Sequence, residues 1–241
     1  MIRLDRLLAS LALGSRQAVG ALVRQGRVLV DGQPVRDPAR RIAEDAAITL
    51  DGQALDTRLQ RHVMMNKPAG VLTAATDPRA PTVMDLLPPV YRSLKCMPVG
   101  RLDKDTEGLL LFTTDGQAAH RLLAPKQQVD KVYQAKVTGR LTQQAVHRFA
   151  EGIALSDFTA LPAQLRILEA GEAKSLALAT VQEGKFHQVK RMFSACGHEV
   201  LALTRLRFGT LALDDALAPG QWRELTAQEW QALREAADGT A

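Results

Sequence analysis

The stretch Val99–Gly116 reads VGRLDKDTEGLLLFTTDG and joins a polar loop to an apolar run. The run GLLLF, followed by the polar TTDG, is typical of a buried strand that ends in a turn. Ahead of it, Asp103, Asp105 and Glu107 occupy alternate positions. This spacing allows three interpretations: a calcium loop, a phosphatase nucleophile, or a loop in which only one carboxylate has a chemical role.

The first two interpretations fail on particular positions. An EF-hand loop that starts at Asp103 needs a bidentate carboxylate at its last position, where this chain has Thr114. An aspartate phosphatase carries DxDxT after an apolar strand, but here threonine follows Asp105 directly, and proline and glycine break the preceding CMPVGRL. On composition alone, a plain surface turn fits the stretch better than a site. The third interpretation therefore depends on the rest of the chain.

Segments of strand and helix character surround this stretch. Helical spacing occurs in QQAVHRFAEGI and HQVKRMFSACG, each of which stops at a glycine, and a short helix is expected from Trp230. Strand patterns occur in HVMMNKPAGVLT, GLLLFTTDG, KVYQAKVTG and SLALATVQEG. Since helices and strands do not alternate strictly, we expect an α+β fold.

The first 40 residues predict two short helices and a β-hairpin. A stripe at helical spacing, made of Leu4, Leu7, Leu8 and Leu11, predicts a helix that ends before Gly14. Ser15 is expected to cap a second helix that stops at Gly26. The inward-facing residues of this helix are expected to be Ala18, Leu22 and Val23. The following RVLVDGQPV predicts two strands joined by a turn at Asp31-Gly32.

Positive charge is concentrated in residues 1–41, which hold eight arginines, no lysine and three aspartates. This segment therefore carries a net charge of +5, equal to that of the whole chain, whose pI is about 9.5. Arginine favours planar, bidentate contact with phosphate. We interpret the segment as an RNA backbone clamp, with a solvated basic face as the structural alternative.

Composition excludes several classes of protein. Every apolar run is shorter than the roughly 18 residues that a membrane span needs. The opening MIRLDRLLAS has charges among its leucines, unlike a secretory signal. Cys96 and Cys196 stand far apart, which predicts neither a disulfide nor a zinc site. We expect a cytoplasmic protein that has no membrane association.

The N-terminal segment RLDRLLASLALGSRQAVGALVRQGRVLVDGQPVRDPARRI resembles the α-L RNA-binding motif named after a small-subunit ribosomal protein. The resemblance implies a small α-L RNA-binding domain, which we place at residues 1–58. The RNA contacts that we assign to it are Arg3, Arg6, Ser15, Arg16, Arg24 and Arg27.

The opening stretch itself resembles the signature of RsuA-type pseudouridine synthases, and further family segments flank it in order. They are NKPAGVLT, DPRAPTVMDLL, KVYQAKV, EGKFHQVKRMFSACGHEVLALTRLRFG and LAPGQWRELT. The resemblance implies a catalytic domain of the pseudouridine synthase type, built on a mixed, mainly antiparallel sheet. We place this domain at residues 59–235.

The resemblance also implies roles for single residues. Asp103 matches the catalytic nucleophile, although a carboxylate at this position can also act as a base toward the sugar. Lys190 matches the basic residue that accompanies it. Tyr133 matches the tyrosine that stacks on the target base, and Leu203 the apolar residue that packs under it. Asp105 is then a hydrogen-bond acceptor that shapes the loop. The plain alternatives are a solvated helix lysine for Lys190 and a core leucine for Leu203.

Substrate contacts are expected from a further set of mainly basic residues. The set consists of Arg101, Lys185, His187 and Arg205, with Arg207 as an additional phosphate contact. The two neighbours Lys190 and Arg191 point about 100° apart on a helix, so only one of them can face Asp103.

The implied reaction breaks the bond from the ribose anomeric carbon to a uracil nitrogen and rejoins the base through carbon 5. No atoms or electrons are gained, so neither a cofactor nor a metal is expected. The uridine has to be flipped out of folded RNA. HQVKR in place of the family variant NR[EQ]VRR favours small-subunit ribosomal RNA, within an assembly intermediate, as the substrate of a monomeric enzyme. Large-subunit RNA, or a non-catalytic RNA-binding assembly factor, is the alternative.

Overall fold

The computed structural model describes residues 1–238, which divide into two compact units. The first unit comprises Met1–Arg61 together with Leu87–Cys96. The second comprises His62–Leu86 and the chain from Met97 onward. None of the described helices is long and apolar enough to cross a membrane.

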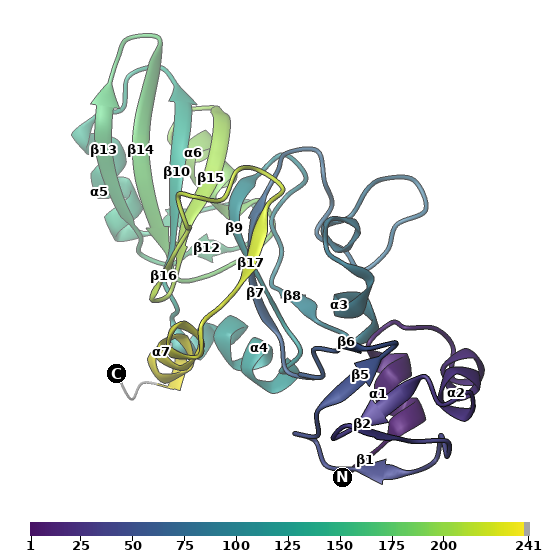
Figure 1. Cartoon of the computed structure of the whole chain (residues 1–241). Helices are drawn as coiled ribbons and strands as arrows, with labels where there is room; N and C mark the ends of the chain where they lie inside the picture. Colours follow the sequence, from purple (N-terminus) through teal and green to yellow (C-terminus); the bar gives the residue numbers. More distant parts are fainter. Residues whose placement is uncertain (239–241) are drawn as a thin grey trace. The chain divides into compact units, whose positions relative to one another are not determined.

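The first unit combines short helices with a small antiparallel sheet (Figure 1). Its helices are α1 (Leu4–Ser10), α2 (Arg16–Arg24) and α3 (Pro89–Ser93). Its strands are β1 (Ile2–Arg3), β2 (Val28–Val30), β3 (Gln33–Pro34), β4 (Arg41–Ile42), β5 (Ile48–Leu50) and β6 (Gln53–Ala54). The sheet has the order β3-β2-β5-β6, and β1 pairs separately with β4.

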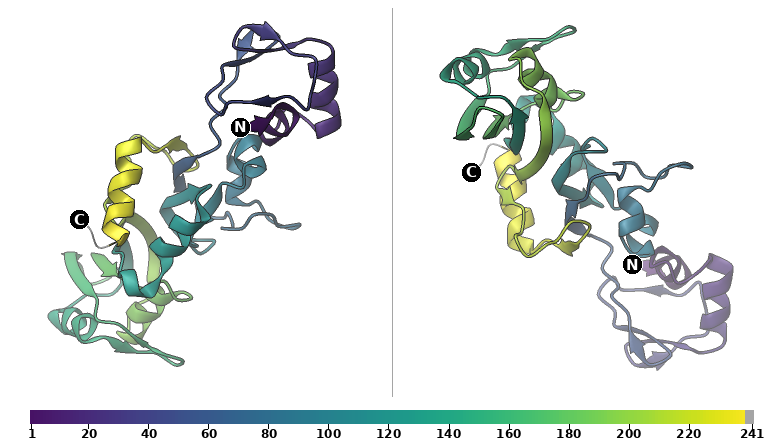
Figure 2. Two further views of the ribbon diagram at one scale, coloured as in Figure 1. Left: turned by 90° about the horizontal axis from the view of Figure 1, so that it is seen from below. Right: turned by 90° about the horizontal axis from the view of Figure 1, so that it is seen from above.

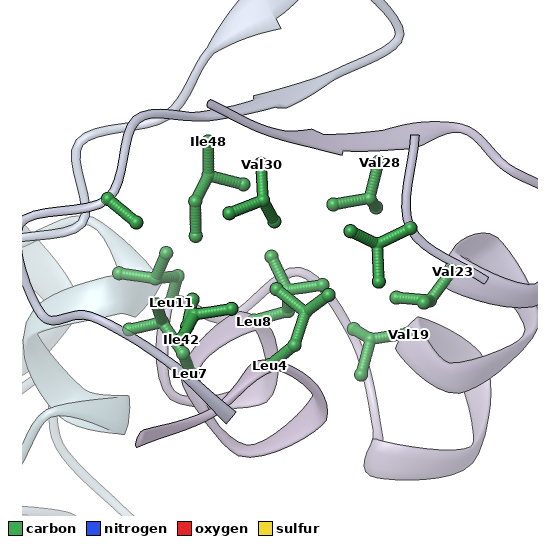
Figure 3. Packing of buried hydrophobic residues seen from close by; sticks show 12 residues of the cluster. Leu4, Leu7, Leu8, Leu11, Val19, Val23, Val28, Val30, Ile42 and Ile48 are labelled. Carbon is green, nitrogen blue, oxygen red and sulfur yellow. The ribbon is translucent and has the colours of Figure 1, made fainter. Parts of the chain in front are cut away.

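The leucine stripe of α1 lies at the centre of this unit's core, as the spacing predicts. Figure 3 shows Leu4, Leu7, Leu8 and Leu11 turned towards the valines and isoleucines of α2 and the sheet. In α2 one inward position differs from the prediction, because Val19 is fully buried whereas Ala18 is exposed. The Ser15 hydroxyl caps α2 by accepting from the Ala18 amide at 3.2 Å.

The hairpin between β2 and β3 turns at Asp31-Gly32, as predicted. Both residues have positive φ angles, 50° and 76°, which a two-residue hairpin turn of this type requires. The expected boundary at residue 58 did not anticipate the later segment Leu87–Cys96, which belongs to the first unit. Val90 of this segment packs against the leucine core, and the Ser93 hydroxyl donates to the Ala9 carbonyl.

The second unit is built on one mixed sheet, of nine strands within the described residues. The strands are β7 (His62–Lys67), β8 (Met97–Val99), β9 (Glu107–Thr113), β10 (Lys131–Thr138), β13 (Gln164–Ala170), β14 (Lys174–Val181), β15 (Val200–Phe208), β16 (Leu211–Ala212) and β17 (Trp222–Glu224). The main order is β13-β14-β10-β15-β9-β7-β17. Only β15 and β9 run parallel, so the described sheet is mainly antiparallel, as the resemblance implied.

Helices cover this sheet in two groups. The helices α4 (Gly116–Leu123) and α7 (Ala227–Asp238) lie side by side in Figure 2, and their Leu122 and Leu233 share a core with Leu109 and Leu111 of β9. The helices α5 (Gln143–Glu151) and α6 (Gln188–Ala195) meet through the rings of Phe149 and Phe193. A two-stranded ribbon, β11 (Ile153–Ala154) with β12 (Thr159–Ala160), follows α5.

Strand β9 is the buried strand expected from GLLLF, and every residue from Gly108 to Thr113 is buried. At its start, Gly108 pairs with Arg205 of the parallel neighbour β15. A Cβ on Gly108 would lie 2.4 Å from the Arg205 carbonyl oxygen, so only glycine allows this approach. The parallel pairing thereby fixes where the acidic loop enters the sheet.

Candidate active site

A narrow pocket of about 60 Å³ opens where the loop before β9 meets β10, β15 and the start of α6. Seven of the eight expected catalytic and substrate-binding residues line it. They are Arg101, Asp103, Tyr133, Lys185, His187, Lys190 and Leu203. Four separate segments of the chain thus converge on one pocket.

Lys190 lies between two carboxylates of the acidic loop. Its Nζ is 3.3 Å from Asp103 Oδ2 and 2.5 Å from Asp105 Oδ1, so its shorter contact is with Asp105. The hydrogen bond from Lys190 holds the pKa of the Asp105 carboxyl below its usual range. The ammonium therefore occupies the place where the spacing of these acids had suggested a metal ion.

Asp103 has two further polar neighbours. The Thr106 hydroxyl lies 3.5 Å from Oδ2, and His187 Nε2 lies 3.5 Å from Oδ1. Asp103 is partly buried, whereas the side chain of Asp105 is largely exposed. Of the two aspartates, only Asp103 lines the pocket and can meet a bound molecule there.

A buried lysine, Lys67, anchors the loop that carries Asp103. Lys67 is 0% exposed, and its Nζ donates to the carbonyls of Pro68, Lys104 and Thr106 at 2.9 to 3.2 Å. Burial lowers the pKa of Lys67 to about 8. Sequence reasoning missed this residue, although it stands in the NKPAGVLT segment that was singled out as a family motif.

A second anchor of the same loop is Thr73. Its hydroxyl donates to the Leu102 carbonyl at 2.8 Å and lies 3.2 Å from the Leu102 amide, which donates to it. Gly70 adds a backbone bond to the Lys104 carbonyl at 2.7 Å. Nothing in the sequence pattern indicated these contacts, because the residues are about 30 positions apart.

The side walls of the pocket come from two neighbouring strands. Tyr133 of β10 is 8% exposed and stands opposite Arg205 of β15, while Leu203 stands opposite Ala135. Both Tyr133 and Leu203 line the pocket. A ring and a branched aliphatic chain form an apolar slot beside Asp103.

The segment before α6 forms a tight turn over the pocket. His187 has a φ of 50°, in the left-handed region, and precedes the first residue of the helix. The Gln188 side chain accepts from the Lys185 amide at 3.1 Å and donates to Glu183 at 3.0 Å. Lys185 Nζ lies 3.8 Å from the centre of the Phe158 ring. Gln188 and Glu183 are further residues that the sequence did not single out.

Arg191 points away from the pocket, as expected for the neighbour of Lys190 on a helix. Its guanidinium pairs with Asp157 and lies 3.1 Å from the Ser156 hydroxyl. This pairing holds the pKa of Asp157 below its usual range. Of these two neighbours, only Lys190 lines the pocket.

The structure does not place Arg205 where the sequence analysis expected it. It was assigned to substrate binding, but it is 2% exposed, does not line the pocket, and donates through Nε to the Leu109 carbonyl at 2.7 Å. Its position on β15 next to buried β9 places the guanidinium inside the sheet core. Arg207, two residues further on, is exposed.

The five arginines that were assigned to RNA contact are all exposed on the first unit. The exposed arginines Arg3, Arg6, Arg16, Arg24 and Arg27 lie on α1, α2 and their flanks. Arg3 pairs with Asp5 at 2.8 Å and Arg27 with Asp51 at 2.5 Å, so part of their charge is already neutralised. The hydroxyl of Ser15 serves as the helix cap.

Comparison with known families identifies both units. Residues 61–195, more than half of the chain, match the family model for RNA pseudouridylate synthase. The chain belongs to the RNA pseudouridine synthase family. Residues 2–48 of this synthase match the S4 domain, which confirms the resemblance of its N-terminal segment to a ribosomal RNA-binding motif.

Relatives of the synthase match it over nearly its whole length. It is 43% identical to an RNA pseudouridine synthase of Bacillus subtilis (strain 168), over 97% of this chain and 99% of that protein. It is 40% identical to the ribosomal small subunit pseudouridine synthase A of Pseudomonas aeruginosa, over 95% and 98% of the two chains. A crystal structure of a pseudouridylate synthase aligns with a TM-score of 0.68 and 32% identity, over 97% and 100%. These matches confirm the RsuA-type resemblance.

Proposed function

We propose that this synthase converts one specific uridine of small-subunit ribosomal RNA to pseudouridine, with Asp103 as nucleophile. Relatives that are named small-subunit pseudouridine synthases, at 38% to 40% identity over nearly the full length, support the choice of RNA. The observation that carries the mechanism is the pocket itself. It joins Asp103, paired with Lys190, to the slot between Tyr133 and Leu203.

The proposed reaction starts when the uridine leaves the RNA stack and its base enters the slot. Tyr133 stacks on the base and Leu203 packs on its other side, which offsets part of the cost of flipping. A base within a helix could not reach Asp103, because the pocket is narrow and Tyr133 is buried in its wall. Base flipping is therefore part of the proposal.

Asp103 then attacks the ribose C1′, and the bond from C1′ to uracil N1 breaks. The uracil turns within the slot, and C5 attacks C1′ and displaces the Asp103 carboxylate. C5 then loses its proton while N1 gains one. The Lys190 ammonium lies 3.3 Å from the attacking carboxylate, on the edge of the pocket. Atoms and electrons balance without a cofactor.

The setting of the reaction also belongs to the proposal. We propose that the enzyme acts as a monomer. The exposed arginines of the first unit fit an RNA that extends beyond the target nucleotide. We place the enzyme in the cytoplasm, acting on RNA within a small-subunit assembly intermediate.

The test incubates the enzyme, with a chelator present, on unmodified small-subunit and large-subunit RNA and maps pseudouridine. We expect one modified position in the small-subunit RNA. Asp103→Asn should reduce kcat/KM by more than about 1,000-fold, because the nucleophile is lost. Product in the large-subunit RNA alone would contradict the substrate, and full activity of Asp103→Asn would contradict the mechanism. Partially assembled subunits, compared with naked RNA, test the preferred substrate form.

A further inference from the structure

Phe186 stands at the mouth of the pocket with its ring in solvent. It is 75% exposed and is the only Phe, Tyr or Trp side chain classed as exposed among residues 1–238. The proposed reaction does not use it. A single exposed ring needs no explanation by itself, but its position next to the pocket makes it available for stacking on a bound molecule.

The Phe186 ring has a defined orientation in the turn that carries it. Its plane stacks on the His187 ring, with centroids 3.8 Å apart and planes 17° from parallel. His187 adopts its left-handed backbone conformation at this point, which costs a non-glycine residue about 1 kcal/mol or more. The Gln188 side chain closes the turn through the Lys185 amide. The turn therefore holds Phe186 outward although the ring gains no burial there.

Phe186 borders a second, wider cleft of about 500 Å³ that is continuous with the pocket. Arg101, Asp103 and His187 line both cavities. On the other side, the wider cleft is bounded by the loop that includes Leu72, Thr73, Ala74 and Asp77. An RNA strand with one nucleotide in the narrow pocket would therefore place the adjacent nucleotide in the wider cleft, beside Phe186.

The rim of the wider cleft carries positive charge. Arg101, Lys104 and Lys185 line it, against the carboxylates of Asp77 and Asp103. Lys185 is held in place by its contact with the Phe158 ring and by Glu183, whose carboxylate lies 3.5 Å from Nζ and offsets part of its charge. A cationic rim around an apolar ring is the combination that binds a stretch of single-stranded nucleic acid, with bases stacked and phosphates paired.

We propose that the wider cleft is a subsite for the nucleotide adjacent to the target uridine, and that Phe186 stacks on its base. The inference rests on the proposed function and extends it to a second nucleotide. When the uridine flips, its neighbour loses a stacking partner, and the Phe186 ring replaces that partner. Phe186 is a positioning residue, because it acts on RNA placement and not on the reacting atoms.

The first test compares Phe186→Ala, Phe186→Leu and Phe186→Trp on a short RNA that contains the mapped target. Base stacking on an aromatic ring predicts a rise in KM of about 5- to 100-fold for the alanine and leucine variants, with kcat nearly unchanged. Phe186→Trp should retain the wild-type KM. Leu168→Ala on β13, which removes another exposed apolar side chain, is the matched control.

The second test removes the partner base. RNA with an abasic site directly 5′ or 3′ of the target should raise the wild-type KM on one side only. That same RNA should bring no further loss with Phe186→Ala, since the two changes remove one contact. An unchanged KM for Phe186→Ala, additive losses, or a loss confined to kcat would overturn the inference.

A binding measurement separates this inference from the proposed function. The RNA carries 2-aminopurine in place of the base next to the target uridine. When this RNA binds the Asp103→Asn variant, the 2-aminopurine fluorescence should be quenched, and adding Phe186→Ala should abolish the quenching. If wild-type enzyme forms no pseudouridine, the proposed function fails. If it forms pseudouridine and Phe186→Ala matches wild type in both assays, only the inference fails.

Discussion

At the scale of single residues, the active site depends on one lysine shared by two unequal carboxylates. Lys190 contacts Asp105 more closely than Asp103, yet Asp105 is largely solvated and outside the pocket. An exposed ion pair contributes little free energy, whereas a partly buried carboxylate gains more from a nearby cation. Under the proposed mechanism, the shorter of the two contacts is therefore not the one that matters for the reaction.

Asp105→Asn tests this distinction. Because the amide still accepts a hydrogen bond from Lys190, we expect kcat/KM to stay within about fivefold of wild type. Kinetics on the target RNA, with Asp103→Asn as the inactive comparison, measure it. A loss as large as that of Asp103→Asn would mean that Asp105 has a direct part in the chemistry.

Lys67 is the second residue whose function follows from its contacts. Lys67→Met would remove the ammonium that donates to three carbonyls, and the buried bond to the Thr106 carbonyl would have no replacement. We expect a loss of about 2–4 kcal/mol in the free energy of unfolding. Since two of these carbonyls belong to the Asp103 loop, kcat should fall more than RNA affinity. Denaturant unfolding and kinetics measure the two effects.

The control for Lys67 is Lys136→Met, which changes an exposed lysine on β10. It should leave stability and kcat close to wild type. If Lys67→Met behaved in the same way, the loop would not depend on the buried ammonium.

At the scale of elements, the site depends on the one parallel pairing in the described sheet. The contact between β9 and β15 brings the acidic loop beside Leu203, and the antiparallel pairing of β15 with β10 brings Tyr133 to the same face. The start of α6 then closes the pocket with Lys190. Strand order brings the pocket residues together, since they lie far apart along the chain.

Gly108→Ala tests the close approach of these two strands. Its Cβ would meet backbone atoms of Arg205 at 2.4 and 2.8 Å, at a φ of +98°. We expect a loss of about 2 kcal/mol or more in the free energy of unfolding, together with reduced activity. Gly116→Ala at the start of α4 meets nothing within 4 Å and should leave both unchanged. Equal stability of the two variants in urea would contradict this account.

At the scale of the whole molecule, charge is divided between the two units. The exposed arginines of the first unit supply a cationic surface, and the second unit contains the complete pocket. We therefore expect variants of these arginines to change RNA affinity and to leave the chemistry in the pocket nearly intact.

The triple variant Arg6→Gln, Arg16→Gln, Arg24→Gln tests this division. RNA affinity should fall, and the slope of log K against log salt should become less steep by about 0.7 for each phosphate contact that is lost. At saturating RNA, kcat should remain near the wild-type value. Arg166→Gln, an exposed arginine on β13, is the control and should leave the salt slope unchanged. An unchanged slope in the triple variant would mean that these arginines do not contact RNA.

The sequence by itself determined the features that depend on neighbouring residues. Helical spacing predicted the leucine core of the first unit, Asp31-Gly32 predicted the hairpin turn, and an apolar run predicted β9. Such patterns are readable because helix and strand periods place side chains on one face, and turns need particular backbone angles. Family motifs added the residues that line the pocket.

Only the tertiary structure decided which side chains are buried and which distant groups meet. It buried Arg205 in the sheet, placed Lys67 under a loop nearly 40 residues away, and joined residues 87–96 to the first unit. It also brought Lys190 to Asp103 and left Phe186 in solvent beside them. Burial and long-range contact depend on strand order and on the packing of helices against the sheet, which no local pattern contains.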